Sequence, residues 1–150
     1  MKIAILSGSV YGTAEEVARH AERVLKLAGF EAWHNPRATL EELLAFGPAA
    51  FLGVTSTTGM GELPDNLQPL YAALRDRLPA WRGCPGGVIA LGDSSYGDTY
   101  CAGGELLGEL FAELGIREVQ PILRLDASET VTPETDAEAW LAAFAAALQP

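Results

Sequence analysis

Residues 3–18 read Ile3-Ala-Ile-Leu-Ser-Gly-Ser-Val-Tyr-Gly-Thr-Ala-Glu-Glu-Val-Ala18. A short apolar strand ends in a loop of glycine and hydroxyl side chains, and the chain then continues with the periodicity of a helix. In such a unit the N–H groups of residues 9–14, with the hydroxyls of Ser9 and Thr13, can converge on an anion at the positive end of the helix dipole. The stretch therefore predicts a phosphate site.

This loop departs from two common nucleotide motifs. Gly8 and Gly12 enclose three residues and no lysine follows, whereas a triphosphate-binding P-loop has a longer glycine spacing followed by lysine. The dinucleotide fingerprint also fails, because Val10 takes a glycine position and residues 31–37 offer no clearly placed ribose acid. These departures favour a single phosphate held by neutral donors, as in a mononucleotide. For the loop alone, an ordinary strand-to-helix turn is the alternative.

Composition and charge limit the class of protein. The 150 residues, with 49% hydrophobic content, fit one domain (1–150) with a sizeable core. No apolar run is long enough to cross a bilayer and no leader pattern is present, so we expect a cytoplasmic protein. Its two cysteines, Cys84 and Cys101, are expected to be reduced. A net charge of −10 argues against nucleic-acid or anionic-membrane binding and suits a basic partner.

Short apolar or β-leaning runs alternate with segments of helical periodicity along the chain. The expected strands are Lys2–Leu6, Glu31–His34, Ala50–Val54, Gly87–Leu91 and Glu118–Leu123. The expected helices are Ala14–Ala28, Leu40–Ala45, Asn66–Leu78, Gly103–Leu114 and Thr135–Leu148. This alternation predicts an α/β fold with a doubly wound, five-stranded parallel sheet and helices on both faces.

Three polar, glycine-bearing loops follow the first, third and fourth expected strands. The first is the phosphate loop. The second, residues 55–66, holds five Ser, Thr or Asn side chains and two glycines, and the third, residues 91–101, holds two tyrosines. Ligands of such sheets bind at the carboxyl ends of the strands. The joint occurrence of the three loops therefore predicts one binding site.

These loops resemble the flavin-binding loops of the flavodoxin family, most closely those of short MioC-like flavodoxins and of the FMN domains of diflavin reductases. Ser9-Val-Tyr-Gly-Thr-Ala-Glu-Glu16 is similar to the family's Ser-x-Thr-Gly-Thr-Ala-Glu-Glu loop, with Tyr11 where Thr is usual. The resemblance covers almost the whole chain. It implies a short-chain flavodoxin-like sheet with strand order 2-1-3-4-5, because residues 118–125 run without a long insertion. It also implies FMN as the cofactor.

The same resemblance implies roles for individual residues. Ser56-Thr-Thr-Gly-Met-Gly-Glu-Leu-Pro-Asp-Asn66 would cover one face of the isoalloxazine, with Thr58 where many relatives have an aromatic residue or His. Leu91-Gly-Asp-Ser-Ser-Tyr96 would place Tyr96 on the other face, and Asp126 matches an acidic position near the flavin. The implied cofactor-binding residues are Ser9, Val10, Tyr11, Gly12, Thr13, Ala14, Ser56, Thr57, Thr58, Gly59, Leu91, Gly92, Asp93, Tyr96, Tyr100, Cys101 and Asp126.

Two details of these loops bear on electron transfer. Gly59 has no Cβ, so the Thr58–Gly59 peptide could turn its carbonyl toward flavin N5 on reduction; the alternative is that Gly59 only shapes a turn. Four acids lie in the loops that would surround the ring: Glu62, Asp65, Asp93 and Asp98. Together they would make the reduced flavin a stronger reductant and form a docking face for basic redox partners. Taken singly, each is more simply interpreted as a solvated loop acid.

The implied function is an electron carrier between an NAD(P)H-dependent flavodoxin reductase and acceptor enzymes, with no substrate chemistry of its own. An FMN-dependent quinone or nitro reductase that uses NAD(P)H directly is the alternative. The single-domain length and the lack of a recognisable nicotinamide site favour the carrier. A flavin-free receiver domain shares the sheet topology but needs acids after the first and third strands and a lysine after the fifth. Those places read Leu6-Ser7, Val54-Thr55 and Leu123-Arg124.

Overall fold

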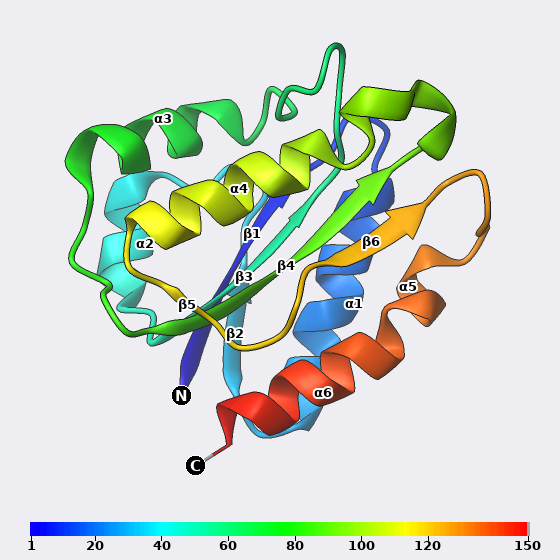
Figure 1. Ribbon diagram of the computed structural model, residues 1–150. Helices are drawn as coiled ribbons and strands as arrows, with labels where there is room; N and C mark the ends of the chain where they lie inside the picture. The colour runs from blue at the N-terminus through cyan, green and yellow to red at the C-terminus, as the bar shows by residue number, and fades with distance from the viewer. Residues whose placement is uncertain (150) are drawn as a thin grey trace.

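The structure is a computed structural model, and it describes residues 1–149, with all their side chains except those of Tyr96 and Asp98. Its centre is a parallel sheet with helices on both faces (Figure 1). The strands are β1 (Lys2–Gly8), β2 (Glu31–His34), β3 (Ala50–Thr55), β4 (Pro85–Gly92), β5 (Arg117–Glu118) and β6 (Leu123–Asp126). Their order is β2-β1-β3-β4-β5, with β6 also paired to β4, which confirms the expected 2-1-3-4-5 topology.

The helices lie close to the predicted segments. They are α1 (Thr13–Leu27), α2 (Leu40–Phe46), α3 (Gln68–Arg77), α4 (Ala102–Glu113), α5 (Pro133–Asp136) and α6 (Glu138–Leu148), with a 3-10 helix over Ser94–Thr99. The last predicted helix, Thr135–Leu148, is divided between α5 and α6. Among the described residues, no helix combines the length and the apolar character that a membrane span requires.

Each face of the sheet has its own hydrophobic core. On one side, α1 and α6 cover the sheet, and Trp140 stacks on Phe144 with ring centroids 5.2 Å apart. On the other side, α2, α3 and α4 cover it, and Phe51 packs against Trp81 at 4.5 Å and Phe111 at 6.1 Å. Figure 1 shows these two helical layers on either side of the strands. Coverage of both faces explains why β1, β3 and β4 are nearly continuous runs of buried residues.

The fifth strand differs from the prediction. Residues 118–123 do not form one strand: β5 ends at Glu118 and β6 begins at Leu123, and both pair with β4. Pro121 lies in the break, and proline has no N–H to donate to a sheet ladder. The carbonyl of Pro121 instead accepts a 2.7 Å hydrogen bond from Trp140 Nε1. The interruption spans only residues 119–122, so the strand still lacks the long insertion whose absence led to the prediction of a short-chain sheet.

The register of the sheet brings the loops of interest to one end. Gly8 pairs with Thr55, Thr55 with Ala90, and Gly92 with Asp126, so β1, β3, β4 and β6 end at similar heights. In Figure 1 the arrows of β1, β3, β4 and β6 point toward the upper right, where the loops after β1, β3 and β4 gather. A ligand bound there would contact segments distant in sequence.

Candidate functional site

A cavity of about 540 Å³ opens at the carboxyl ends of β1, β3 and β4. This volume is in the range of sites for small ligands. The lining residues come from the end of β4, from the loops after these three strands and from the first turn of α1, with one residue after β6: Ser9, Val10, Tyr11, Thr13, Ala14, Ser56, Thr57, Thr58, Gly59, Leu91, Gly92, Asp93, Thr99 and Ala127.

The structure brings most of the sequence-predicted site residues to this one cavity. Gly12, Tyr100, Cys101 and Asp126 do not line it, and the side chain of Tyr96 lies outside the described residues. Thr99 and Ala127 line it and were not predicted. Ala127 has no polar group that would mark it in the sequence, and its place follows from the pairing of β6 with β4. That these residues bind FMN stays a prediction.

The N-terminus of α1 forms one end of the cavity. Gly12 precedes the helix with φ +94°, a left-handed conformation that favours glycine. The carbonyl of Gly12 accepts the N–H of Glu16 at 2.9 Å, and no side chain among the described residues caps the helix. The N–H groups of the first turn, beginning with Thr13 and Ala14, have no intrahelical partners. They are donors suited to an anion in the cavity.

Two donors expected in the phosphate loop are used within the protein. The N–H of Ser9 donates to Asn66 Oδ1 at 2.9 Å, and the N–H of Gly12 donates to Ser9 Oγ at 2.9 Å. In this structure these two of the N–H groups of residues 9–14 are therefore bound to partners within the protein. The loop satisfies part of its own backbone, which fixes its shape, and leaves the helix terminus for a ligand.

The cavity is nearly free of charge. Among its described lining side chains, Asp93 alone is ionisable with a formal charge at neutral pH. The Asp93 carboxylate accepts hydrogen bonds from the N–H of Ser95 at 2.9 Å and from Ser95 Oγ at 2.6 Å, and so caps the 3-10 helix. A phosphate here would be held by N–H and hydroxyl donors and not by lysine or arginine.

The loop after β3 is folded back on itself. The carbonyl of Thr58 accepts the N–H of Gly61 at 3.1 Å and of Glu62 at 2.8 Å, while the N–H of Thr58 donates to the Glu62 carbonyl at 2.9 Å. Gly59 has φ +54° at the tip of this turn. A turn of the Thr58–Gly59 carbonyl toward a ligand would therefore have to break two hydrogen bonds.

The loop also rests on α4. Thr57 Oγ1 accepts the N–H of Gly103 at 2.9 Å. A Cβ added to Gly103 would lie 2.5 Å from the Ser56 carbonyl oxygen, so only glycine permits this approach. The N-terminal turn of α4 thus sets the position of two cavity-lining residues.

Two of the predicted site residues that do not line the cavity, Tyr100 and Cys101, follow each other after β4. Cys101 is fully buried, and its thiol lies 3.6 Å from the Ala90 carbonyl oxygen. Burial raises the pKa of the Cys101 thiol, and burial also raises the pKa of Tyr100 to about 12. Neither group is therefore ionised near neutral pH.

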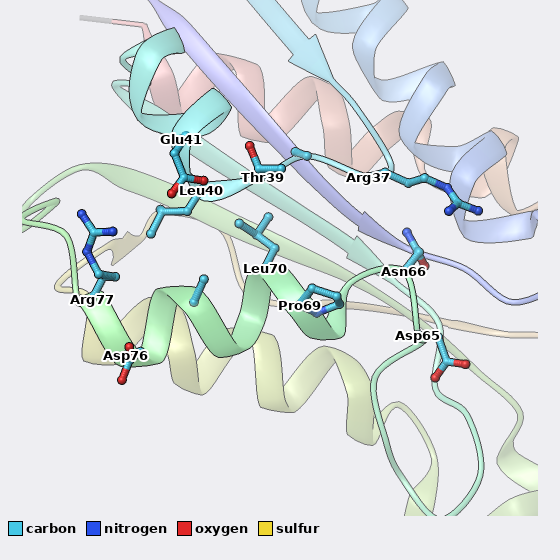
Figure 2. A pocket seen from close by; sticks show the side chains of 12 residues that line it. Arg37, Thr39, Leu40, Glu41, Asp65, Asn66, Pro69, Leu70, Asp76 and Arg77 are labelled. Carbon is cyan, nitrogen blue, oxygen red and sulfur yellow. The ribbon is translucent and has the colours of Figure 1, made fainter.

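The described residues do not place all four predicted acids in the wall of the cavity: Glu62 does not line it, although its carboxyl group lies 3.8 Å from where a Cβ of the cavity-lining Gly59 would be. Asp93 lines the cavity, and the side chain of Asp98 lies outside the part of the chain that the structure describes. Asp65 lines a separate groove of about 500 Å³. Figure 2 shows this groove with Asp65, Asn66 and Arg37 at one end and Asp76 and Arg77 of α3 at the other. Asp65 therefore lines the groove beside α3 and not the flavin cavity, which corrects its expected place around the ring.

Comparisons with known proteins agree with this geometry. The family model described as flavodoxin matches residues 5–140. A protein of Pseudomonas aeruginosa is 78% identical over 149 residues, covering 99% of both chains. Flavodoxin YqcA of Pectobacterium carotovorum is 46% identical over 147 residues, covering 96% of this chain and 95% of the relative.

A solved structure is also close. A C101A mutant of a flavodoxin from Pseudomonas aeruginosa superposes with a TM-score of 0.97 at 77% identity and covers 100% of both chains. The sheet order, the cavity at the strand ends and these similarities lead to the same assignment. The chain belongs to the flavodoxin family of FMN-binding electron carriers.

Proposed function

We propose that this chain, as a single domain, binds FMN in the cavity at the ends of β1, β3 and β4 and carries electrons from an NAD(P)H-dependent reductase to acceptor enzymes. The observation that carries the proposal is the pairing of an uncapped helix terminus with a nearly uncharged cavity of about 540 Å³. Bound FMN would supply one- and two-electron transfer, with potentials set by the surrounding hydrogen bonds, stacking and charge.

The residues present fit FMN at both ends of the cavity. The N–H groups of Thr13 and Ala14 and the Thr13 hydroxyl would hold the phosphate, since the positive end of a helix favours an anion. The isoalloxazine would lie between the loop of residues 56–59 and the loop that begins at Leu91. Asp93, the charged residue among the described lining side chains, follows β4 and not β1, and its carboxylate is hydrogen-bonded to Ser95.

The outer edge of the cavity suits contact with another protein. Tyr11 is 95% exposed and Met60 88% exposed, and the exposed Glu62 lies two positions after Met60 in the chain. Apolar side chains next to acids, in a chain of net charge −10, fit basic redox partners that dock close to the flavin. The free cysteines suit a reducing compartment, and we place the protein in the cytoplasm.

The carrier and the reductase alternative differ in one measurable property. A carrier shows the absorption spectrum of bound flavin but consumes NAD(P)H only when a flavodoxin reductase is added. We expect added protein to speed the reductase-dependent reduction of an acceptor such as cytochrome c beyond the rate with the same concentration of free FMN. Steady NAD(P)H consumption by the purified protein alone would instead identify a quinone or nitro reductase.

A further inference from the structure

Asn66 is the last residue of the polar loop after β3, and its side-chain amide makes hydrogen bonds to three backbone groups. Nδ2 donates to the Ser7 carbonyl at 3.0 Å and to the Pro36 carbonyl at 2.7 Å, while Oδ1 accepts the N–H of Ser9 at 2.9 Å. The opposite amide orientation would set an oxygen against two carbonyls and a nitrogen against an N–H. The three partners therefore fix which atom is which.

These contacts continue into the phosphate loop. Ser9, held by Asn66 through its N–H, accepts the N–H of Gly12 with its hydroxyl at 2.9 Å. The Gly12 carbonyl in turn accepts the N–H of Glu16 at 2.9 Å, which is the first hydrogen bond of α1. A continuous series of hydrogen bonds thus runs from the Asn66 amide to the helix terminus that faces the cavity.

Ser56, near the start of the polar loop after β3 that Asn66 ends, holds Gly8, the residue before Ser9. The Gly8 carbonyl accepts the N–H of Ser56 at 3.0 Å. Residues 56 and 66 therefore hold the start of the phosphate loop from both sides. Asn66 itself does not line the flavin cavity but lies in the wall of the second groove, beside the segment of Arg37 (Figure 2).

We propose that Asn66 is a positioning residue for the cofactor's phosphate, acting through Ser9 and Gly12 without touching FMN. The inference rests on the proposed FMN site. Because Asn66 acts on the phosphate loop and not on the loops beside the ring, its loss should weaken binding of FMN much more than binding of riboflavin, which lacks the phosphate. A residue needed only for general stability would change both affinities alike.

Three variants separate these cases. Asn66→Ala removes all three hydrogen bonds. Asn66→Asp keeps the acceptor for Ser9 but loses both donors and sets a carboxylate against two carbonyl oxygens. Gln68→Ala is the matched control. It removes a nearby side-chain amide whose Nε2 donates to the Leu63 carbonyl at 2.8 Å, five positions away, and not to the phosphate loop. Gln68 lines neither the cavity nor the groove.

The first measurement is the dissociation constant of each variant for FMN and for riboflavin, by titration of flavin fluorescence. We expect Asn66→Ala and Asn66→Asp to bind FMN about tenfold more weakly or worse, with riboflavin affinity within about twofold of wild type. Gln68→Ala should match the wild-type protein for both ligands. Equal losses for FMN and riboflavin in both Asn66 variants would overturn the proposal.

The second measurement needs no flavin, so it separates this inference from the proposed function. In the apoprotein, the Ser9 amide should exchange its hydrogen slowly in wild type and Gln68→Ala, and about tenfold faster in Asn66→Ala. Unchanged exchange at Ser9 would overturn the role of Asn66. If wild-type protein bound FMN and riboflavin equally, the phosphate assignment itself would fail, and faster Ser9 exchange would still identify Asn66 as the residue that holds the loop.

Discussion

The carboxylate of Asp126 accepts a 3.1 Å hydrogen bond from the N–H of Ser94, so the end of β6 holds the loop that follows β4. The same oxygen accepts the N–H of Ser128 at 2.9 Å and its hydroxyl at 2.8 Å. The Ser94 and Ser128 hydroxyls lie 3.1 Å apart. Asp126 does not line the cavity but joins two of the loops around it, and its expected place near the flavin stays a prediction.

This arrangement predicts a pH dependence of stability. Hydrogen bonds from Ser94, and then from Ser128, hold the pKa of the Asp126 carboxyl well below its usual 3.8. A pKa lowered in the folded state stabilises the fold above the unfolded-state pKa, and this stabilisation is lost as pH falls through the folded-state pKa. We expect Asp126→Asn to lower the melting temperature near neutral pH, by an amount that shrinks once the pH falls below 3.8.

Melting curves of wild type and Asp126→Asn at a series of pH values measure this difference. Glu129→Gln is the matched control, because it removes a nearby carboxylate for which no hydrogen bond is described, and it should change the melting temperature little at any pH. A difference between wild type and Asp126→Asn that stayed constant into acid would mean that the carboxylate charge does not stabilise the loops.

The approach of α4 to the loop after β3 predicts opposite effects for two glycines of one helix. A Cβ at Gly103 would lie 2.5 Å from the Ser56 carbonyl oxygen and 3.2 Å from Thr57 Oγ1, whereas a Cβ at Gly108 would meet nothing within 4 Å. Gly103→Ala should lower the free energy of unfolding by about 1–3 kcal/mol. Gly108→Ala should raise it by about 0.5–1 kcal/mol, because alanine is the better helix former. Urea unfolding measures both, and a stabilising Gly103→Ala would contradict the packing.

The resemblance to flavodoxins predicts which tyrosine stacks on the ring. Thr58 has no aromatic ring to stack on the flavin, so the aromatic side chain on the opposite face should provide the stacking. Tyr96→Ala should therefore weaken FMN binding by roughly 1–3 kcal/mol. Tyr100→Ala should cost less, since Tyr100 does not line the cavity. Fluorescence titration of the two variants provides the comparison. Wild-type FMN affinity in Tyr96→Ala would show that another residue covers the ring.

The acidic surface predicts salt-dependent association with a basic reductase. Exposed charges are screened beyond a Debye length of about 10 Å at 0.1 M salt, so electron-transfer rates should fall as ionic strength rises. Glu62→Gln, next to the cavity, should lower the rate and flatten its salt dependence. Asp76→Asn, at the far end of the second groove, makes the same charge change and should do less. Stopped-flow rates that are equal for the two variants would argue against docking at the flavin edge.

Much of the fold follows from local patterns in the sequence. The continuous apolar runs of β1, β3 and β4 are typical of central strands, and Gly29 and Gly115 have the positive φ angles expected after α1 and α4. The fifth strand was predicted less well, because the apolar residues between Glu118 and Leu123 give the pattern of one continuous strand where the structure has a break. Pro121 was the signal for that break, since it cannot donate to the neighbouring strand.

The sequence predicts the three loops that form the cavity. It does not predict the contacts that shape these loops. The partners of the Asn66 amide lie 30 to 59 positions away, so no local pattern marks it, and an asparagine before a helix looks like an ordinary cap. The use of the Ser9 and Gly12 N–H groups inside the loop depends on these distant contacts. Asp65, one position before Asn66, lines the second groove together with it and does not line the flavin cavity, and no local pattern marks this place either.

The most direct test compares FMN with riboflavin on the wild-type protein, by fluorescence titration under one set of conditions. The two ligands share the ring and differ at the phosphate, which would meet the uncapped terminus of α1. Several hydrogen bonds to a charged group predict that FMN binds at least about a hundredfold more tightly than riboflavin. Equal dissociation constants would contradict the phosphate site, and with it the proposed position of FMN in the cavity.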